Sequence, residues 1–466
     1  LAAVAGVVAA GSVVTALLRD DEEPADAKGD GRPLGNAVPT VELTDPPEPL
    51  WSKESPSRFV MPSLHAFEKT LLVHEPSLTS VALDTAAGTV RWSTGLLEAN
   101  GTSEGKRPLG LDSKVLGPVE GGVLIYATGA STGLRTGRKD HLAVFDPATG
   151  RERSRAVLQQ SVSPHRLLAT HGDTVYCFSS GLADFALPSP GETPSFDYRE
   201  EIVALSVRTG KVHWRKPAAA GTGYGPRHAA DRLGFYYCEN TDEGLTLHAV
   251  DAADGKARWS VKVPADPDSN LPPYMQGGSG RLGSSVVAAG DVLLAVNLKG
   301  GLTAHDAETG ERRWSVPVTA ATAPGVVGDL VLTNDPTQVH AVDLATGEVR
   351  WRITSPLGLS PMLDDDPVLA ASEDITAVLF SPMHMDAQGD FRTDGKAGVL
   401  VLRTSDGRQQ WALREDPAPV ADPSPSPSGI GGGTRTEPGL ASLAVRDRTV
   451  FLFSGNRVRA FRAEEK

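Results

Sequence analysis

Cysteine is scarce in this sequence, with two residues, Cys177 and Cys238, in a chain of 466. The chain therefore has no C-x-x-C-H haem attachment motif, and no cysteine follows its apolar start, which excludes lipidation at a lipobox. It also lacks a G-x-S-x-G nucleophile elbow, a phosphate-binding loop and the motifs of a kinase catalytic domain. No residues are nominated as a nucleophile with its base, so we expect this chain not to be an enzyme.

Positive charge is also in short supply. There are 45 Lys and Arg against 58 Asp and Glu, which gives a formal net charge of −13 at pH 7. Such a balance argues against nucleic acid or an anionic membrane surface as the partner. Hydrophobic residues make up 40% of the chain, which is ample for a large core.

Long uncharged runs are rare, and the longest is at the start of the chain, LAAVAGVVAAGSVVTALL at 1–18. Its length is near the lower limit for crossing a bilayer as a helix. We expect a transmembrane or signal-anchor helix there, and the alternative is the apolar core of a signal peptide. The chain begins with Leu1 rather than Met, so we also expect it to be a fragment or a processed product.

Residues 19–47 have no hydrophobic periodicity. From Arg19 to Leu50 the chain has nine acidic residues against three basic ones and several prolines. This composition predicts a disordered acidic linker.

The remainder, 48–466, contains one motif written seven times, for example HAVDLATGEVRW at 340–351. A glycine occupies the same place in every copy, and a tryptophan follows it by four residues in six of them. The turn glycines are Gly88, Gly150, Gly210, Gly255, Gly310, Gly347 and Gly407. The tryptophans are Trp92, Trp214, Trp259, Trp314, Trp351 and Trp411, with the remaining one, Trp51, just before the first copy.

Each copy predicts a β-hairpin, because two alternating runs flank a turn whose glycine supplies positive φ. An aspartate four residues before the glycine can bond the turn's own backbone. A small residue, alanine in most copies, leaves room for the tryptophan ring. In the copy whose tryptophan position is Ser154, the alanine is replaced by Val144. Because the two changes occur together, we predict that the small residue and the ring form a packing pair.

Two further short strands around a tight turn precede each hairpin, as at 324–334. Four strands per unit and a period near fifty residues predict a β-propeller, in which each unit packs against its neighbours. The first turns number eight, whereas the complete hairpins number seven. We therefore expect an all-β, eight-bladed propeller of four-stranded antiparallel blades, closed by pairing the strand of Trp51 with the last, C-terminal blade.

Long inserts interrupt the blades at two kinds of position. They lie between second and third strands at 130–140, 181–199 and 382–396, and between blades at 97–112, 264–282 and 415–438. In an up-and-down blade both kinds of connection leave on the same face. We expect this face to bind a protein or a small-molecule ligand, although residues 416–438 have the composition of a low-complexity loop.

The motif A-x-D-x-x-T-G-x-x-x-W resembles the repeat of the pyrroloquinoline quinone (PQQ)-like eight-bladed propellers, over residues 48 to 462. That class includes quinoprotein alcohol dehydrogenases, the outer-membrane-assembly lipoprotein of Gram-negative bacteria and extracytoplasmic sensor regions of actinobacterial serine/threonine kinases. The resemblance implies the fold and leaves the function open. The dehydrogenases add an adjacent cysteine pair, a calcium or lanthanide site and a catalytic aspartate. This sequence has no adjacent cysteine pair, so we expect no cofactor.

Three smaller features were weighed as sites. Cys177 and Cys238 lie at similar places in adjacent blades, where the separation disfavours a disulfide, so we expect two buried thiols. Met383-His384-Met385 could hold copper, and the acidic run 364–366 could attract a hard cation. Neither run has a second ligand cluster, so no metal site is predicted.

The sequence therefore predicts a non-catalytic extracytoplasmic propeller on a single-pass membrane anchor, or a secreted one in the alternative. We expect a sensor or recognition module, conceivably the outer half of a receptor kinase whose catalytic part precedes Leu1. The alternatives are an envelope assembly scaffold that binds proteins and a quinoprotein dehydrogenase.

Overall fold

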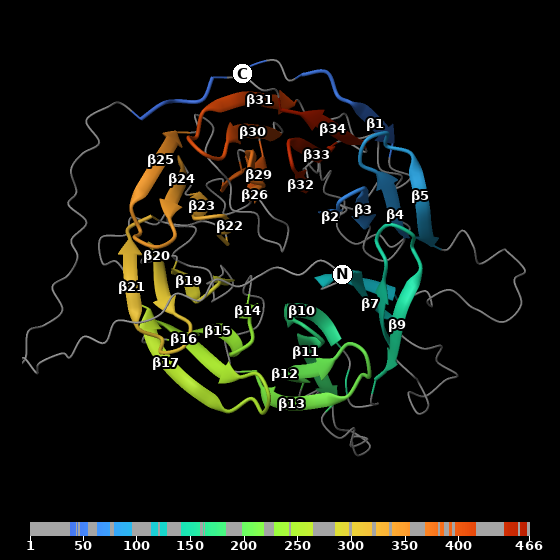
Figure 1. The fold of residues 1–466 in the computed structure, drawn as a ribbon, viewed down its shortest axis with the longest axis vertical. Helices are drawn as coiled ribbons and strands as arrows, with labels where there is room; N and C mark the ends of the chain where they lie inside the picture. The colour runs from blue at the N-terminus through green and yellow to red at the C-terminus, as the bar shows by residue number, and fades with distance from the viewer. Residues whose placement is uncertain are drawn as a thin grey trace, which may run out of the picture. The chain divides into compact units, whose positions relative to one another are not determined.

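The alternating apolar residues and glycine turns build β-sheet throughout the part of the chain that the structure describes. The computed structural model contains eight four-stranded antiparallel sheets, arranged as blades in a ring (Figure 1). The predicted eight-bladed propeller is confirmed. Apolar side chains of neighbouring blades pack face to face, as Tyr176 does against Phe235 with ring centroids 4.8 Å apart.

Seven blades use strands that follow one another along the chain. From inner to outer strand, the first four are β2 (Ser63–Ala66), β3 (Thr70–His74), β4 (Thr79–Asp84) and β5 (Val90–Gly95); β6 (Ser113–Val119), β7 (Gly122–Ala127), β8 (His141–Phe145) and β9 (Glu152–Val157); β10 (Pro164–His171), β11 (Thr174–Leu182), β12 (Tyr198–Ser206) and β13 (Val212–Pro217); and β14 (Ala229–Ala230), β15 (Gly234–Thr241), β16 (Gly244–Asp251) and β17 (Ala257–Val263). The next three are β18 (Ser285–Ala289), β19 (Val292–Asn297), β20 (Gly301–Asp306) and β21 (Arg312–Val316); β22 (Gly325–Val327), β23 (Leu330–Asn334), β24 (Gln338–Asp343) and β25 (Val349–Thr354); and β26 (Leu369–Ala371), β27 (Ile375–Phe380), β30 (Ala397–Arg403) and β31 (Gln409–Glu415). A separate hairpin, β28 (Met383–Met385) with β29 (Phe391–Thr393), lies within the insert of the seventh blade.

The eighth blade joins the two ends of the ring. Its inner strands are β32 (Ser442–Arg446), β33 (Thr449–Ser454) and β34 (Arg457–Arg462), and its outer strand is β1 (Trp51–Glu54). Trp51 pairs with Ala460 and Glu54 with Arg457 in an antiparallel register. The predicted closure by Trp51 and its neighbours is thus present, and it leaves no open edge between the first and last blades.

The structure describes the chain with gaps. The described residues are 38–42, 44, 47–54, 63–74, 79–95, 113–119, 122–127, 141–158, 162, 164–182, 198–218, 228–241, 244–263, 285–297, 301–318, 323–334, 338–354, 369–380, 383–385, 391–393, 397–415, 442–454 and 457–463. The helix expected at 1–18 lies outside them, as does 416–438. None of the described ranges includes a helix of the length and hydrophobicity that crossing a bilayer requires.

The ring begins earlier than expected. Residues 38–44 fall inside the predicted 19–47 linker, yet they are bonded to the rim and belong to the same unit as the blades. We call residues 38–44 the strap, which runs along the outer edges of β25 and β31 toward β1 (Figure 1). The Val41 amide donates to the carbonyl of Thr354 at 3.0 Å, and the Thr354 amide donates to that of Pro39 at 2.8 Å.

On the next blade the strap is held at Ala412 and Gln409. The Thr44 amide donates to the Ala412 carbonyl at 3.2 Å, and the Ala412 amide donates to Thr44 Oγ1 at 3.0 Å. The Glu42 amide donates to Gln409 Oε1 at 3.0 Å. Val41 is only 5% exposed, in the same apolar cluster as Ile353 and Leu413. A polar, proline-containing segment is therefore ordered by edge hydrogen bonds and one buried side chain.

We expect Val41→Asp to release the strap without unfolding the blades. A carboxylate in this apolar position would lose its hydration without a partner. Amide hydrogen exchange should speed up at Thr354 and Ala412, whose amides bond to the strap, while the Ala341 amide inside β24 should be unaffected. Val41→Ile is the matched control and should keep the wild-type protection. Unchanged exchange at both rim amides in Val41→Asp would contradict a strap held by this side chain.

Candidate functional site

The tryptophans of the motif lie on outer strands of the blades, each opposite a small residue on the neighbouring strand. Trp351 pairs with Ala341, and Trp51 pairs with Ala460. Where Ser154 replaces the tryptophan, its cross-strand partner is Val144. The predicted pairs of small residue and ring are thus cross-strand neighbours within one blade. What the ring contacts on its other side belongs to the next blade.

Six tryptophans dock on the turn glycine of the following blade. The φ angles of these glycines are positive, and a Cβ on Gly407 would lie 2.6 Å from two ring atoms of Trp351. The docked pairs are Trp51 on Gly88, Trp92 on Gly150, Trp214 on Gly255, Trp259 on Gly310, Trp314 on Gly347 and Trp351 on Gly407. Glycine is therefore needed twice at each position, for the backbone conformation and for the space above it.

The indole N–H groups add a polar contact to this packing. Five of them donate at 2.9 to 3.1 Å to a carbonyl in the turn of the next blade. These bonds join Trp51 to Thr85, Trp92 to Pro147, Trp214 to Ala252, Trp314 to Leu344 and Trp351 to Thr404. Each buried indole is thus satisfied across a blade interface, as buried Trp N–H groups usually are.

Two blade interfaces depart from this arrangement. At the copy without a tryptophan, a Cβ on Gly210 would lie 2.5 Å from the Val157 carbonyl oxygen, so backbone occupies the place of the ring. At the last interface Trp411 meets the closing blade, which has no Thr-Gly turn, and its ring lies 5.5 Å from that of Phe461. The sequence signals both exceptions, through Ser154 and through the incomplete eighth copy.

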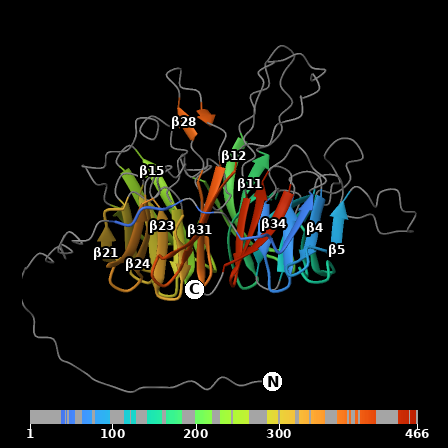
Figure 2. The same ribbon diagram turned by 90° about the horizontal axis from the view of Figure 1, so that it is seen from above.

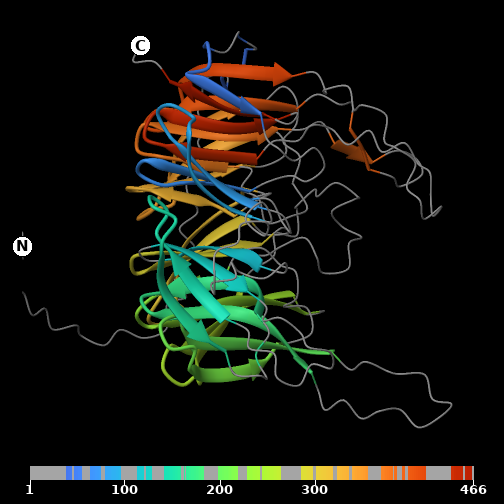
Figure 3. The ribbon, with the colours of Figure 1, turned by 90° about the vertical axis from the view of Figure 1, so that its right-hand side faces the viewer.

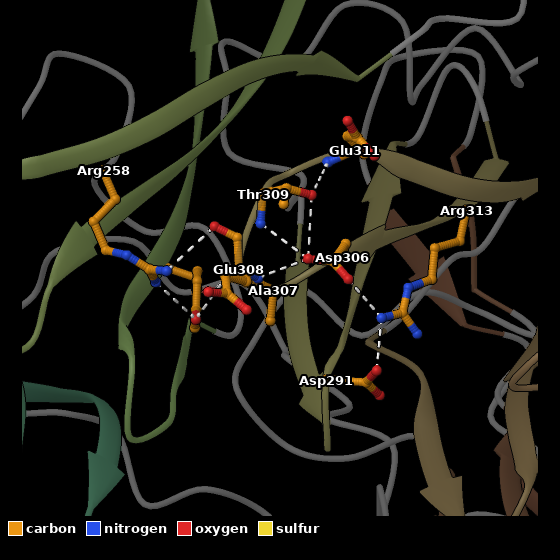
Figure 4. A network of polar contacts seen from close by, with 9 residues as sticks. Arg258, Asp291, Asp306, Ala307, Glu308, Thr309, Glu311 and Arg313 are labelled. Atoms are coloured by element: carbon orange, nitrogen blue, oxygen red, sulfur yellow. Dashed lines mark hydrogen bonds and ion pairs between the residues drawn. The ribbon is translucent and has the colours of Figure 1, made fainter. Parts of the chain in front are cut away.

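The turn aspartates bond the turn backbone as predicted, and they also bind an arginine that the motif analysis missed. Asp306 Oδ1 accepts the amides of Glu308 and Thr309, both at 2.9 Å, while its Oδ2 accepts Arg313 at 2.6 Å (Figure 4). Arg313 also reaches Asp291 in the first turn of the same blade. The signal was an arginine seven residues after the aspartate, which recurs in Asp84 with Arg91, Asp146 with Arg153 and Asp343 with Arg350.

These pairs predict acid sensitivity. The bonds from Arg350 and the turn amides lower the pKa of Asp343 from its usual 3.8 to about 2. Since the folded-state pKa is depressed, the stabilisation is complete above about pH 4 and is lost as the pH falls toward 2. Wild type should exceed Asp343→Asn in urea-unfolding free energy at pH 6, and the difference should shrink toward pH 2. A pH-independent difference, or none at pH 6, would contradict this.

The tight turns of both kinds lie on one face of the ring. In five blades with a Thr-Gly or equivalent turn, and in the closing blade, the amide just after the third strand donates to a carbonyl of the first turn, as Leu344 does to Asp329 at 2.8 Å. We call this side the turn face. The opposite side, the loop face, is where β7, β11 and β27 end and the long connections begin. The hairpin β28–β29 projects beyond this face (Figures 2 and 3).

The smaller candidates show no ligand cluster. Cys177 and Cys238 are buried free thiols, and burial raises the pKa of Cys177 to about 12. Met383-His384-Met385 forms β28, where His384 pairs with Arg392. Within the described ranges no three His, Cys, Asp or Glu side chains gather as metal ligands would. The acidic run 364–366 lies outside these ranges.

A profile of the family described as outer membrane protein assembly factor BamB matches residues 138–325 and 320–465. Among solved structures, BamB from Moraxella catarrhalis is 15% identical, with a TM-score of 0.50 over 89% of this chain and 99% of that chain. The computationally designed Ika8 protein gives the same score and coverage at 12% identity. Both likenesses show the fold alone.

A stretch of 127 residues is 28% identical to the quinohemoprotein alcohol dehydrogenase ADH-IIG of Pseudomonas putida. It covers 24% of this chain and only 16% of the length of that dehydrogenase. The profile match, by contrast, extends over more than half of the chain and includes the repeats from the third blade through the last C-terminal strand. The chain therefore belongs to the PQQ-like propeller family described as outer membrane protein assembly factor BamB.

Proposed function

We propose that this chain is a non-catalytic, protein-binding propeller that serves as an assembly scaffold in the cell envelope. The observation that carries the proposal is the inequality of the two faces. Paired turns close one face, whereas the long connections leave from the other. Binding residues concentrate on loops held by a rigid scaffold, so the loop face is the partner surface. Family membership supports the scaffold role, since the family is described as an assembly factor.

Two further features support binding rather than catalysis. The ring is held by buried tryptophans and ion-paired turns that repeat around it, which is a rigid framework rather than a mobile active site. Titratable side chains with shifted pKa values are mostly the turn aspartates and their arginines, whose shifts follow from structural bonds. No cofactor enters this proposal. The ring would lie outside the cytoplasm, anchored through residues 1–18 or secreted.

The proposal is tested by placing a photo-cross-linking amino acid at single positions of the full chain in its native host. Position 384 in β28 represents the loop face. Positions 86 and 253 are exposed alanines in the turns and represent the opposite face. We expect protein adducts from position 384 and none from the two turn positions. Adducts from the turn face alone, or from no position, would overturn the loop face as the partner surface.

The finer proposal of a sensor region shares this binding face and differs in what it requires upstream. A receptor kinase would place its catalytic domain before residue 1, in the same reading frame. Reading the uninterrupted frame upstream of Leu1 decides between the two: a kinase domain would replace the scaffold with the sensor. For the quinoprotein alternative, the partial match to ADH-IIG predicts retained quinone and dye-linked alcohol oxidation in the purified chain. We expect neither.

A further inference from the structure

The strap shows how the rim groove between two blades binds an extended chain. Its valine lies above Ile353 of β25, two residues after the docking tryptophan, and is flanked by Ala412 of β31, one residue after the next one. Leu400 is the cross-strand partner of Ala412, and Val378 is that of Leu400. All four of these groove residues are buried and apolar. This groove therefore selects an aliphatic side chain.

The groove between β13 and β17 has the same positions filled by polar groups. Lys216 stands two residues after Trp214, and Ser260 stands one residue after Trp259. Tyr237 and His248 are cross-strand partners, and His248 is in turn the partner of Ser260. Lysine, serine, histidine and tyrosine thus replace isoleucine, alanine, leucine and valine. An aliphatic side chain cannot satisfy such a groove.

These polar groups contact one another and leave one charge unbalanced. Lys216 Nζ lies 2.9 Å from Tyr237 Oη, and the Tyr237 ring stacks on His248 with centroids 4.8 Å apart. His248 Nδ1 lies 2.8 Å from Ser260 Oγ, and its Nε2 lies 3.1 Å from Glu239 Oε2. Among the residues that the structure describes, the ion pair of Glu239 is with His248, and Lys216 has no carboxylate within ion-pair distance.

The groove therefore presents a partly buried ammonium to the rim beside the exposed hydroxyl of Ser260. Burial lowers the pKa of His248, opposed by Glu239, so the imidazole is uncharged at neutral pH and Lys216 is the positive charge of the groove. A carboxylate placed there would pair with Lys216 and accept a hydrogen bond from Ser260. Charge-assisted bonds of this kind are stronger than bonds between neutral groups.

We propose that the groove between β13 and β17 binds an extended acidic segment of a partner protein in the manner of the strap, with a carboxylate side chain in the place of Val41. The backbone contact is one bond weaker than the strap's, because Pro217 stands where Thr354 donates an amide. Its carbonyl remains as an acceptor. This inference rests on the proposed protein-binding function but uses a different surface, the rim rather than the loop face.

The test uses two fluorescently labelled peptides and the full chain. One peptide has the strap sequence of residues 39–44, PTVELT, and the other is PTEELT, with glutamate in the place of valine. By fluorescence anisotropy at low salt, we expect PTEELT to bind at least about ten-fold more tightly, since an ion pair that is partly buried is screened less than an exposed one. Lys216→Met should abolish this preference. Lys256→Met, on the turn face of the same blade, is the matched control and should keep it.

Equal affinities for the two peptides, or an unchanged preference in Lys216→Met, would overturn the proposal. Full competition by free glutarate at the peptide's own concentration would also overturn it, by showing that the groove binds a small carboxylate rather than an extended segment. Loop-face cross-links at position 384 do not depend on Lys216. Their persistence in Lys216→Met with both peptides unbound would reject the rim site and leave the scaffold function standing, whereas their absence would reject the scaffold function alone.

Discussion

Replacing Trp51 by alanine is expected to lower the free energy of unfolding of the whole ring by about 3 to 5 kcal/mol, as for large core aromatics. The side chain is 9% exposed, docks on Gly88 and donates to the Thr85 carbonyl at 3.0 Å. Its strand also completes the blade that joins the two ends of the ring. Loss of the indole therefore weakens one blade interface and the closure together. Deleting residues 49–53 should destabilise the ring further, since β34 would lose its outer partner.

The measurement is urea unfolding followed by far-ultraviolet circular dichroism, which does not depend on the tryptophan signal. Ser52→Ala is the control, because Ser52 lies on the same strand and is exposed, and it should change the free energy by less than about 0.5 kcal/mol. Wild-type stability in Trp51→Ala would show that the ring is closed without this contact. A separate early transition, rather than a shift of the whole curve, would show that the closing blade unfolds alone.

The second large effect is expected at the docked glycines. Gly407 has φ +70°, and a Cβ there would lie 2.6 Å from the ring of Trp351. Gly407→Ala combines a left-handed backbone, which costs about 1–2 kcal/mol with a side chain, with overpacking of about 1–3 kcal/mol. The loss should therefore be about 2 to 5 kcal/mol in the same unfolding assay.

Gly290 separates the two causes. Its φ of +66° is similar, but no atom lies within 4 Å of the position of its Cβ. Gly290→Ala should therefore lose about 1–2 kcal/mol, from the backbone alone. Equal losses for Gly407→Ala and Gly290→Ala would mean that the tryptophan does not press on the glycine. A larger loss at Gly407 assigns the remainder to the docked ring.

Much of the architecture is local in origin, which is why it could be predicted. The Asp-x-x-Thr-Gly turn and the alternating strands around it define a hairpin wherever they occur, and their recurrence implies the ring. The paired loss of tryptophan and alanine at Ser154 and Val144 located the packing pair. The missing hairpin after Phe461 called for an outer strand, and Trp51 was the remaining tryptophan. Each of these inferences needed only neighbouring residues or a count.

The candidate site was less accessible to this reasoning. The inserts implied a loop face, and the hydrogen bonds between the turns place both turn types on the other side. The partnership of Asp343 with Arg350 was visible as a spacing of seven and was overlooked. The polar groove at Lys216 could not be recognised, because its members lie on three strands of two blades and resemble ordinary strand residues in sequence.

By itself, then, the sequence determined the number of blades, the strands in each and the means of closure, because a turn and a period are properties of short segments. The tertiary structure decided which glycine each tryptophan meets, and it converted the last part of an acidic linker into a strap. Glu42 bonds to Gln409, 367 residues away, and Val41 is buried only because β25 and β31 form a groove for it. Contacts of such range depend on the finished ring, since no local preference of a proline-containing, acidic segment specifies them.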